Sequence, residues 1–421
     1  MKKAILLLVI SLMTYACMGL LPAVKANELS ENKNKEPIIL VNGFLGWGRE
    51  EALGFKYWGG FHDIQEKLKT DGYQVFTSAV GPVSSNWDRA CELYAQINGG
   101  TVDYGAAHAE EHGHARFGRT YEGFGVNWNE DNKIHLVGHS MGGQTSRTLV
   151  QLLKEGSHEE QEYKNQHPEV EISSLFEGGK SFVRSVTTIA SPHNGTTLAD
   201  GIGTFIPFAK DLLVATAFFV HSSDYMVYDF KLDQWGIKKN KGESFFDYSK
   251  RVWNSPIWSD TKDTCQWDLS TDGARELNNW VKTQPDVYYF SYSASATKQG
   301  VLTGVHIPIL SMNKALMGNA LFMGAYLRND NNRPTIDESW WENDGVINTK
   351  SMIGPETDEI VPYNQQAQIG KWNYLGKKAG WDHLDLIGLS ISDSLGFSDI
   401  TTYYREIAKM VTKLPENEIV Y

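Results

Sequence analysis

Cysteine is scarce in this chain: three residues in 421, of which only Cys91 and Cys265 lie beyond residue 17. Two cysteines form one disulfide at most, so a disulfide-built scaffold is excluded. Basic residues are also in the minority, with 39 Lys and Arg against 51 Asp and Glu and a formal net charge of −12. Because binding to nucleic acid needs a basic surface, we expect no nucleic acid partner.

Long hydrophobic runs are confined to the start of the chain, so we expect no transmembrane anchor after it. Residues 1–26 hold a dilysine, an apolar run, and Val24 and Ala26 at the minus-three and minus-one positions of a cleavage site. This order is typical of a secretory signal peptide and predicts a secreted, extracellular protein. The alternatives are a membrane anchor, for which the run is short, and a lipoprotein at Cys17, which lacks a good lipobox.

The rest of the chain has the composition of a folded protein, at 41% hydrophobic and 12% aromatic residues. A polar lead-in (27–36) and a short tail (415–421) flank one predicted domain at 37–414. Apolar runs that end in turn residues alternate with helical patterns, which indicates an α/β fold with a mainly parallel central sheet flanked by helices. The expected strands are 38–41, 73–80, 134–137, 183–190 and 287–292.

One helical pattern is unusually apolar. Between residues 204 and 220, large apolar side chains recur at three- and four-residue steps, namely at Phe205, Phe208, Leu212, Ala215 and Phe219. The pattern fits a buried core helix or a movable lid.

A G-x-S-x-G motif at residues 138–142 places Ser140 between a predicted buried strand and a predicted helix. This context is typical of a nucleophile elbow, in which a tight turn exposes the serine hydroxyl. The helix N-terminus directs amide groups toward a developing oxyanion. We therefore predict that Ser140 is a catalytic nucleophile.

A serine needs a base, and in an α/β-hydrolase the acid and then the histidine follow the serine along the chain. His383 is the only histidine after residue 306, which makes it the predicted base. The acid is less well defined by pattern. Asp344 leads because it lies in an Asn-Asp-Gly turn, and the other candidates are Asp337, Glu342, Asp358 and Glu359. Asp382 adjoins the base, where we expect poor access to its ring.

The oxyanion hole of this fold uses the amide after the nucleophile and an amide from an early strand end. These positions predict Met141 and Phe44.

Three histidines lie close together at 108, 112 and 114, and Asp88 precedes them. Imidazoles with carboxylates form a ligand set that zinc accepts, although a solvated polar loop would show the same residues.

Taken together, the motifs resemble the secreted lipases of staphylococci and thermophilic bacilli, a branch of the α/β-hydrolases. The matching segments include NGFLGWGREE (42–51), VGHSMGGQTSR (137–147), SVTTIASPHNGTT (185–197), WENDG (341–345) and WDHLDLIG (381–388), and a long match covers 79–121. The resemblance implies the triad Ser140, Asp344 and His383, with Phe44 and Met141 as oxyanion amides.

The same resemblance implies a small inserted zinc-binding subdomain with a structural zinc on Asp88, His108, His114 and Asp263, with Asp260 as the fallback and His112 left out. It also implies a helical lid at about 197–227. A calcium site would involve Ser311, Asp385 and Ser390, where the family's second carboxylate is replaced by Ser390 and Asp393 lies nearby. Calcium affinity is then reduced, because one charge is missing. The chain also departs at Asn42, where the family usually has a histidine.

Zinc on Asp88 and Asp263 would bring Cys91 and Cys265 near the metal. They would then form a disulfide or pack as small apolar groups.

The triad and the resemblance together predict a triacylglycerol lipase acting on lipid at an oil–water interface. The alternatives are a carboxylesterase or phospholipase on the same triad, and a catalytically silent binding module.

Overall fold

The computed structural model describes residues 34–220, 228–389 and 400–415. The predicted signal peptide, residues 221–227 of the predicted lid, Ser390, Asp393 and most of the predicted tail lie outside them. The main sheet has seven strands in the order β10-β11-β7-β6-β5-β1-β2, and every neighbouring pair is parallel. The strands are β1 (Ile38–Val41), β2 (Val75–Thr77), β5 (Ile134–His139), β6 (Val183–Ile189), β7 (Tyr288–Ser295), β10 (Ile360–Pro362) and β11 (Trp372–Ala379).

The strands β1, β5 and β6 are buried along their whole length because both faces of the sheet are covered. In β1, Ile38 and Leu40 point into one hydrophobic cluster, while Ile39 and Val41 point into the other. The predicted mainly parallel sheet is confirmed. The strand predicted at 73–80 is shorter than expected, and the edge strand β10 and its neighbour β11 were not predicted.

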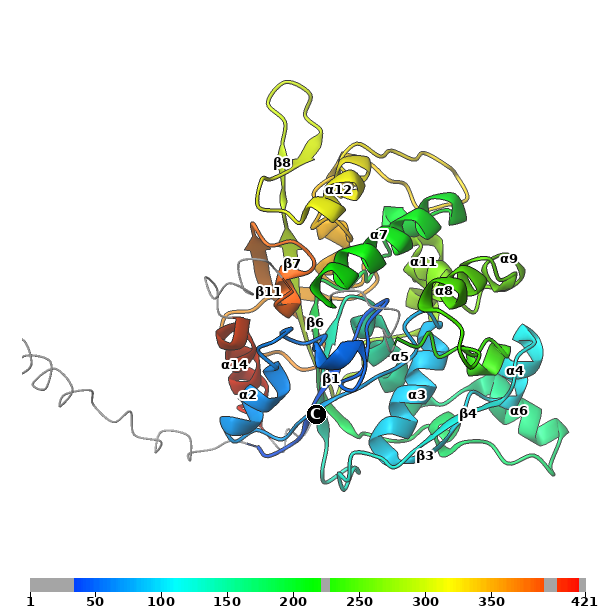
Figure 1. Ribbon diagram of the computed structural model, residues 1–421. Coiled ribbons are helices and arrows are strands. Elements are labelled where there is room, and N and C mark those ends of the chain that lie inside the picture. The colour runs from blue at the N-terminus through cyan, green and yellow to red at the C-terminus, as the bar shows by residue number, and fades with distance from the viewer. Residues whose placement is uncertain (1–33, 221–227, 390–399, 416–421) are drawn as a thin grey trace, which may run out of the picture.

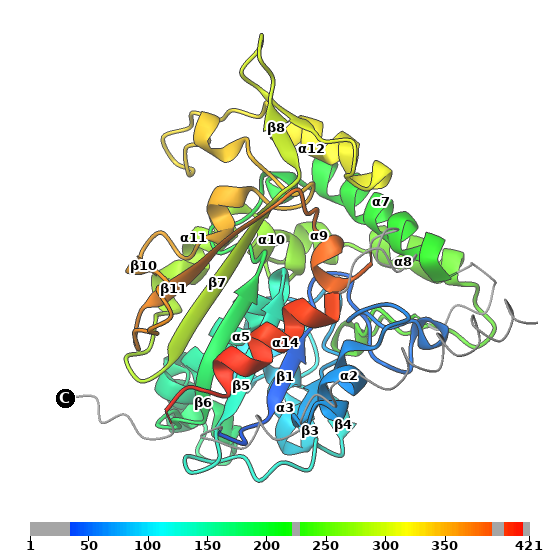
Figure 2. The same ribbon diagram turned by 90° about the vertical axis from the view of Figure 1, so that its left-hand side faces the viewer.

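Helices lie on both sides of this sheet (Figures 1 and 2). α2 (Ile64–Thr70) and α14 (Ile400–Val411) pack together on one face, and α3 (Asn86–Asn98) and α5 (Met141–Glu155) pack together on the other. The other α-helices of the described residues are α4 (Ala106–His112), α6 (His158–Gln166), α7 (Ile202–Val220), α8 (Phe245–Trp253), α9 (Ile257–Asp260), α10 (Cys265–Leu269), α11 (Thr271–Trp280) and α12 (Met317–Met323). None of the described helices has the length and apolar character needed to cross a membrane.

Two small antiparallel pairs stand apart from the main sheet. β3 (Gly100–Asp103) pairs with β4 (Phe117–Tyr121), and the histidine-rich segment lies between them. β8 (Thr297–Gln299) pairs with β9 (His306–Pro308) in a hairpin that begins one residue after β7. The hairpin therefore extends from the carboxyl edge of the sheet, and it projects at the top of Figures 1 and 2.

Candidate active site and metal site

Ser140 occupies a sharp turn between β5 and α5. Its backbone has φ 55° and ψ −133°, a conformation that residues other than glycine rarely adopt. The turn is held because the Ser140 amide donates to the Ile189 carbonyl at 2.9 Å and the Gly143 amide donates to the Ser140 carbonyl at 3.0 Å. This is the strand-turn-helix geometry that the motif predicts.

The glycines of the motif are required by close backbone contacts. A Cβ on Gly138 would lie 2.5 Å from the Gly142 backbone, and one on Gly142 would lie 2.2 Å from the Val41 carbonyl oxygen. Across the turn, a Cβ on Gly43 would lie 2.7 Å from the Ser140 Cβ. The loop after β1 therefore passes directly against the serine, and only glycine fits at this approach.

His383 and Asp344 form a buried pair. The His383 Nδ1 lies 2.7 Å from the Asp344 Oδ2, and the His383 backbone amide donates to the Asp344 carbonyl at 3.1 Å. The other carboxylate oxygen accepts from the amides of Val346 and Ile347 at 2.9 and 2.7 Å. Asp344 thus has a fixed orientation toward the ring.

The other candidate acids are engaged elsewhere. Glu342 pairs with Lys377 and Glu359 with Lys371, each at 2.6 Å, and Asp358 accepts from Thr283 at 2.5 Å. Asp337 caps the turn at Ser339. Asp382 accepts from the backbone amides of Leu384, Asp385 and Asn313. Among the five candidates and Asp382, the hydrogen bond to the His383 ring belongs to Asp344.

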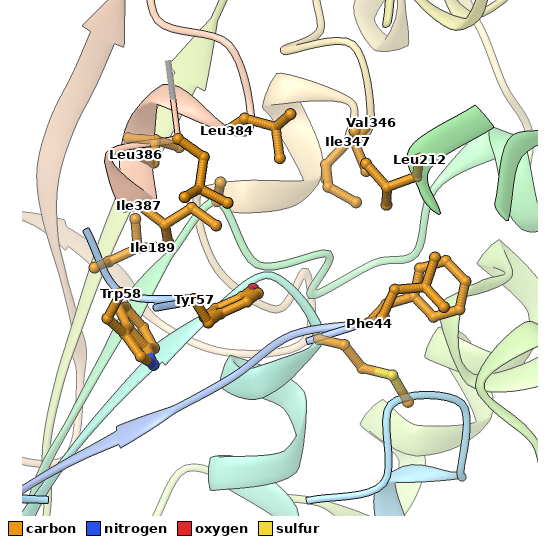
Figure 3. Packing of buried hydrophobic residues seen from close by; sticks show 14 of the residues in the cluster. Phe44, Tyr57, Trp58, Ile189, Leu212, Val346, Ile347, Leu384, Leu386 and Ile387 are labelled. Atoms are coloured by element: carbon orange, nitrogen blue, oxygen red, sulfur yellow. The ribbon is translucent and has the colours of Figure 1, made fainter. Parts of the chain in front are cut away.

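Ser140 and His383 line the same narrow cavity, whose volume is about 20 Å³. That volume admits a water molecule or two and no acyl chain. Most of its lining residues are apolar, among them Phe44, Leu212, Val346, Ile347 and Leu384, which Figure 3 labels. Two of the lining side chains, Phe208 and Leu212, come from α7, which lies across the carboxyl edge of the sheet in Figure 1.

α7 contacts the loop after β1 through aromatic rings. The Phe44 ring lies 5.3 Å from that of Phe205 and 5.9 Å from that of Phe208, measured between centroids. Phe205, Phe208 and Leu212 of the predicted stripe are buried. The side chains of Ala215 and Phe219 lie outside what the structure describes.

The amides of Phe44 and Met141 donate no hydrogen bond within the described part of the chain. Met141 follows the serine, and Phe44 follows the glycine that packs against it. Two adjacent N–H groups without a partner are what an oxyanion hole requires.

Sequence reasoning missed Tyr57 and His139. The Tyr57 hydroxyl accepts from the Gly43 amide at 3.0 Å and lies 2.6 Å from the His139 Nδ1. The His139 Nε2 lies 3.2 Å from the His383 carbonyl oxygen. Burial, and secondly the nearby charge of His383, hold the pKa of His139 well below its usual value, so this ring is neutral. A continuous chain of hydrogen bonds therefore joins the oxyanion loop to the base. No signal in the sequence pointed to Tyr57.

Asn42 stands at the position where the resemblance leads one to expect histidine. Its side-chain amide lies 3.3 Å from the Gly43 carbonyl oxygen, and its own carbonyl accepts from the buried Arg89. Arg89 also donates to the Gly81 carbonyl and to Thr145, which ties the loop to α3 and α5.

A second cluster of side chains has no member in the lining of the serine cavity. One ligand atom from each of Asp88, His108, His114 and Asp263 falls within 4.8 Å of the others. The His108 Nε2 lies 3.4 Å from an oxygen of both Asp88 and Asp263, and the His114 Nε2 lies 3.2 Å from Asp263. α3, the segment from α4 to β4, and the loop before α10 bring these residues together.

The cluster has the properties of a metal site. Four of its atoms (Asp88 Oδ1, His108 Nε2, His114 Nε2 and Asp263 Oδ2) are buried and have no hydrogen-bond partner within the described residues. Burial, and secondly the Asp263 charge, raise the pKa of Asp88. Two imidazoles and two carboxylates around one point form a ligand set that accepts zinc.

Other residues near this cluster in the sequence are not part of the four-residue group. The His112 Nδ1 lies 3.1 Å from the Thr261 hydroxyl, outside the four-residue group, and Asp260 accepts from Ser259. Cys91 and Cys265 are both free and buried, so the disulfide interpretation is wrong and they pack as small apolar groups.

Of the residues considered for calcium, Asp385 accepts from the Asp382 amide at 2.8 Å, and Ser311 is exposed in the segment after β9. Asn313, two residues after Ser311, donates its amide to Asp382, so the two segments are adjacent. Ser390 lies outside the described residues.

The parallel sheet, the serine turn after β5 and the acid and histidine on later loops define an α/β-hydrolase. The family model described as "Lipase-like, C-terminal domain" matches residues 34–417. The chain is 37% identical over 406 residues to a lipase from Staphylococcus hyicus, covering 94% of this chain and 60% of the relative.

Solved structures of similar proteins agree with this family assignment. EstA from Clostridium botulinum has a TM-score of 0.84 at 48% identity, covering 91% of this chain and 88% of that one. Lipase 1 from Pelosinus fermentans has a TM-score of 0.82 at 52% identity, covering 91% and 100%. This chain therefore belongs to the lipase-like C-terminal domain family, with staphylococcal lipases among its relatives. It spans three fifths of the length of the Staphylococcus hyicus lipase.

Proposed function

We propose that this protein is a lipase that hydrolyses carboxylic ester bonds of lipids, triacylglycerols in particular. The observation that carries the proposal is the buried Asp344–His383 pair, at 2.7 Å, whose His383 lines the same cavity as Ser140. Lipases among the relatives support the same activity.

In the proposed reaction the Ser140 hydroxyl attacks the ester carbonyl while the His383 Nε2 accepts its proton. Asp344 holds the His383 Nδ1 proton, which fixes the tautomer and stabilises the charged ring. The histidine then protonates the leaving alcohol, an acyl-serine forms, and water releases the fatty acid. The proposal requires the serine hydroxyl and the Nε2 to come within hydrogen-bond distance when substrate binds.

The amides of Phe44 and Met141 are proposed to receive the oxyanion. Support comes from their place beside Ser140 and from the absence of a partner for either amide within the described residues. Loss of one such donor typically lowers turnover by about 10²–10³.

We assign α7 as the lid. The cavity under it is too small for an acyl chain, so substrate entry requires α7 to move. In aqueous solution the apolar stripe of α7 packs against the protein and is hidden from water. On a lipid surface its exposure no longer costs hydrophobic free energy.

The metal is proposed to be a structural zinc on Asp88, His108, His114 and Asp263. It would neutralise two buried carboxylates and link α3, the histidine segment and the loop before α10. A calcium site at Ser311, Asp385 and Ser390 is a separate proposal, in which the cation would join the segment after β9 to the loop that carries His383.

We also propose that the domain at 37–414 is exported, with residues 1–26 as a signal peptide that is removed. The polar lead-in and the tail at 415–421 would then flank a single hydrolase domain.

Turnover of a soluble p-nitrophenyl ester tests the chemistry. Ser140→Ala is expected to lower kcat by about 10⁴ or more, because the remaining groups cannot replace the nucleophile. Equal rates would exclude the triad and leave the silent binding module. Faster turnover of emulsified triolein than of soluble short esters supports a lipase, and the reverse indicates a carboxylesterase. Release of fatty acid from phospholipid vesicles alone indicates a phospholipase.

A further inference from the structure

Exposed apolar side chains gather at one end of the molecule. Six of the eleven large hydrophobic side chains that are exposed in the described residues lie between 300 and 330: Val301, Leu302, Leu310, Leu321, Phe322 and Leu327. Val301 is 100% exposed, and Leu302 and Leu310 are each 99% exposed. Single exposed aliphatic residues are normal, but a group of them marks an interaction surface.

Val301 and Leu302 form the tip of the β8–β9 hairpin. The turn is closed where the Gly300 amide donates to the Val305 carbonyl at 2.8 Å and the Gly304 amide donates to the Gly300 carbonyl at 2.9 Å. Val301 and Leu302 therefore stand at the far end of a ribbon that, among the described strands, pairs only with itself. Figures 1 and 2 show this ribbon projecting beyond α12 and α7.

The hairpin is anchored beside the proposed acid. The Ala296 amide, between β7 and β8, donates to the Asn343 carbonyl at 3.0 Å, one residue before Asp344. The segment that follows β9 contacts α7 and α12. The base of the hairpin thus lies on the same edge of the sheet as the serine cavity, and the segment after β9 contacts α7, which covers that cavity.

The charge of this region differs from that of the rest of the chain. Residues 287–329 contain no Asp or Glu, although the chain has 51 of them, and they include Lys298, Lys314 and Arg328. This stretch of an acidic protein therefore contributes no negative charge of its own. A convex apolar tip without acids fits a fluid apolar phase, which deforms around it, better than a shaped protein groove.

We propose that the β8–β9 hairpin is a fixed anchor that inserts Val301 and Leu302 into the surface of aggregated neutral lipid and holds the lid edge against it. This inference rests on the proposed lipase function. It differs from the lid proposal because the hairpin is already exposed and needs no opening.

The test measures binding without hydrolysis, in the Ser140→Ala protein. Partition onto a gum-arabic-stabilised triolein emulsion is measured by flotation, with and without Val301→Ser/Leu302→Ser. The double substitution is expected to weaken partition by about tenfold, since two aliphatic side chains no longer leave water. Phe117→Ser, at an exposed apolar residue of β4, is the matched control and should change partition by less than twofold.

A second measurement places the tip directly. Leu302→Cys in a Cys17→Ser background is labelled with an environment-sensitive dye, which is selective because Cys91 and Cys265 are buried. We expect a blue shift when triolein emulsion is added, and none for Phe117→Cys. No shift at position 302, or unchanged partition of the double variant, would overturn the proposal. A shift that depends on protein concentration without lipid would show that a second copy covers the tip instead.

Soluble-ester turnover of Val301→Ser/Leu302→Ser with Ser140 intact should stay within twofold of wild type. Failure of the lipase proposal would appear as absent turnover in wild type, whereas failure of the anchor proposal appears only in partition and fluorescence.

Discussion

Asp344 and His383 are joined twice, once between the carboxylate and the ring at 2.7 Å and once between the His383 amide and the Asp344 carbonyl at 3.1 Å. The two residues are 39 positions apart in the chain. The second bond fixes the backbone that carries the ring, so the first does not depend on side-chain packing alone.

Replacing the acid should therefore affect turnover strongly. We expect Asp344→Asn to lower kcat by about 10⁴, because an amide stabilises the wrong tautomer of the histidine. Steady-state hydrolysis of a soluble ester measures this. Glu342→Gln, which removes another candidate acid, is the control and should remain near wild type. Comparable losses in both variants would remove Asp344 from the triad.

Metal removal should lower the thermal stability of the protein more than its rate of ester hydrolysis. With the four-residue group emptied by chelation, two buried carboxylates lose their cation, and we expect the Tm to fall by about 5 °C or more. Initial rates on a soluble ester well below the Tm should change little. Added zinc should restore the Tm, and an unchanged Tm after verified metal loss would contradict a structural role.

Elemental analysis can identify the fourth ligand. Asp263→Asn should reduce the bound zinc well below one per chain, because it removes one anionic ligand. Asp260→Asn is the matched control, since Asp260 lies nearby in the chain but outside the group. Loss of zinc from the Asp260 variant alone would reverse the assignment.

The lid proposal predicts a split between substrates. Phe208→Ser/Leu212→Ser should cut turnover of emulsified triolein by about tenfold or more, because the opened helix offers less apolar area to lipid. Turnover of a short soluble ester should not fall. Lys210→Ala, on the exposed side of the same helix, is the control. Equal losses on both substrates would indicate a core helix instead.

Tyr57 is expected to act through its neighbours. Tyr57→Phe leaves the Gly43 amide and the His139 Nδ1 without their shared hydroxyl, at a cost of about 1–3 kcal/mol for a buried unpaired group. We expect kcat to drop by about tenfold with a smaller change in KM, since Gly43 positions the Phe44 amide. Unchanged kcat would show that the hydroxyl is only structural.

Glu92 predicts a pH dependence of stability. Burial raises its pKa from 4.5 to about 7 in the folded protein. Between pH 4.5 and 7 the folded state holds a proton that the unfolded state has lost. The contribution of Glu92 to the free energy of unfolding is therefore greatest below pH 4.5 and declines as the pH rises to 7. Glu92→Gln mimics the protonated form. Its Tm relative to wild type should therefore be higher at pH 8 than at pH 5, at equal metal content, and a constant difference would contradict the shift.

The sequence alone predicted the sheet core and the serine turn, because the strand at 38–41 is continuously apolar and a G-x-S-x-G motif between a strand and a helix is typical of a nucleophile elbow. It also placed His383 by chain order. It could not separate Asp344 from Glu342 or Asp358 by pattern, since all are carboxylates in polar loops and only tertiary packing decides which meets the ring.

Strand β11 was not predicted because it carries lysines on its exposed half, and its register with β7 is set by long-range pairing. Tyr57 was missed for a similar reason. A single tyrosine in an aromatic segment carries no sign of the two distant groups that its hydroxyl joins. Predicting the four metal ligands required the histidine cluster and also Asp263, which lies far along the chain. The resemblance to the lipase family supplied Asp263, and the spacing of residues did not.

The left-handed backbone of Ser140 sets activity against folding at this one position. An L-residue is strained there and glycine is not, so Ser140→Gly would relieve strain of about 1–3 kcal/mol while abolishing the nucleophile. A screen for thermal stability alone would favour that inactive protein, whereas selection for growth on triacylglycerol as the carbon source would restore serine.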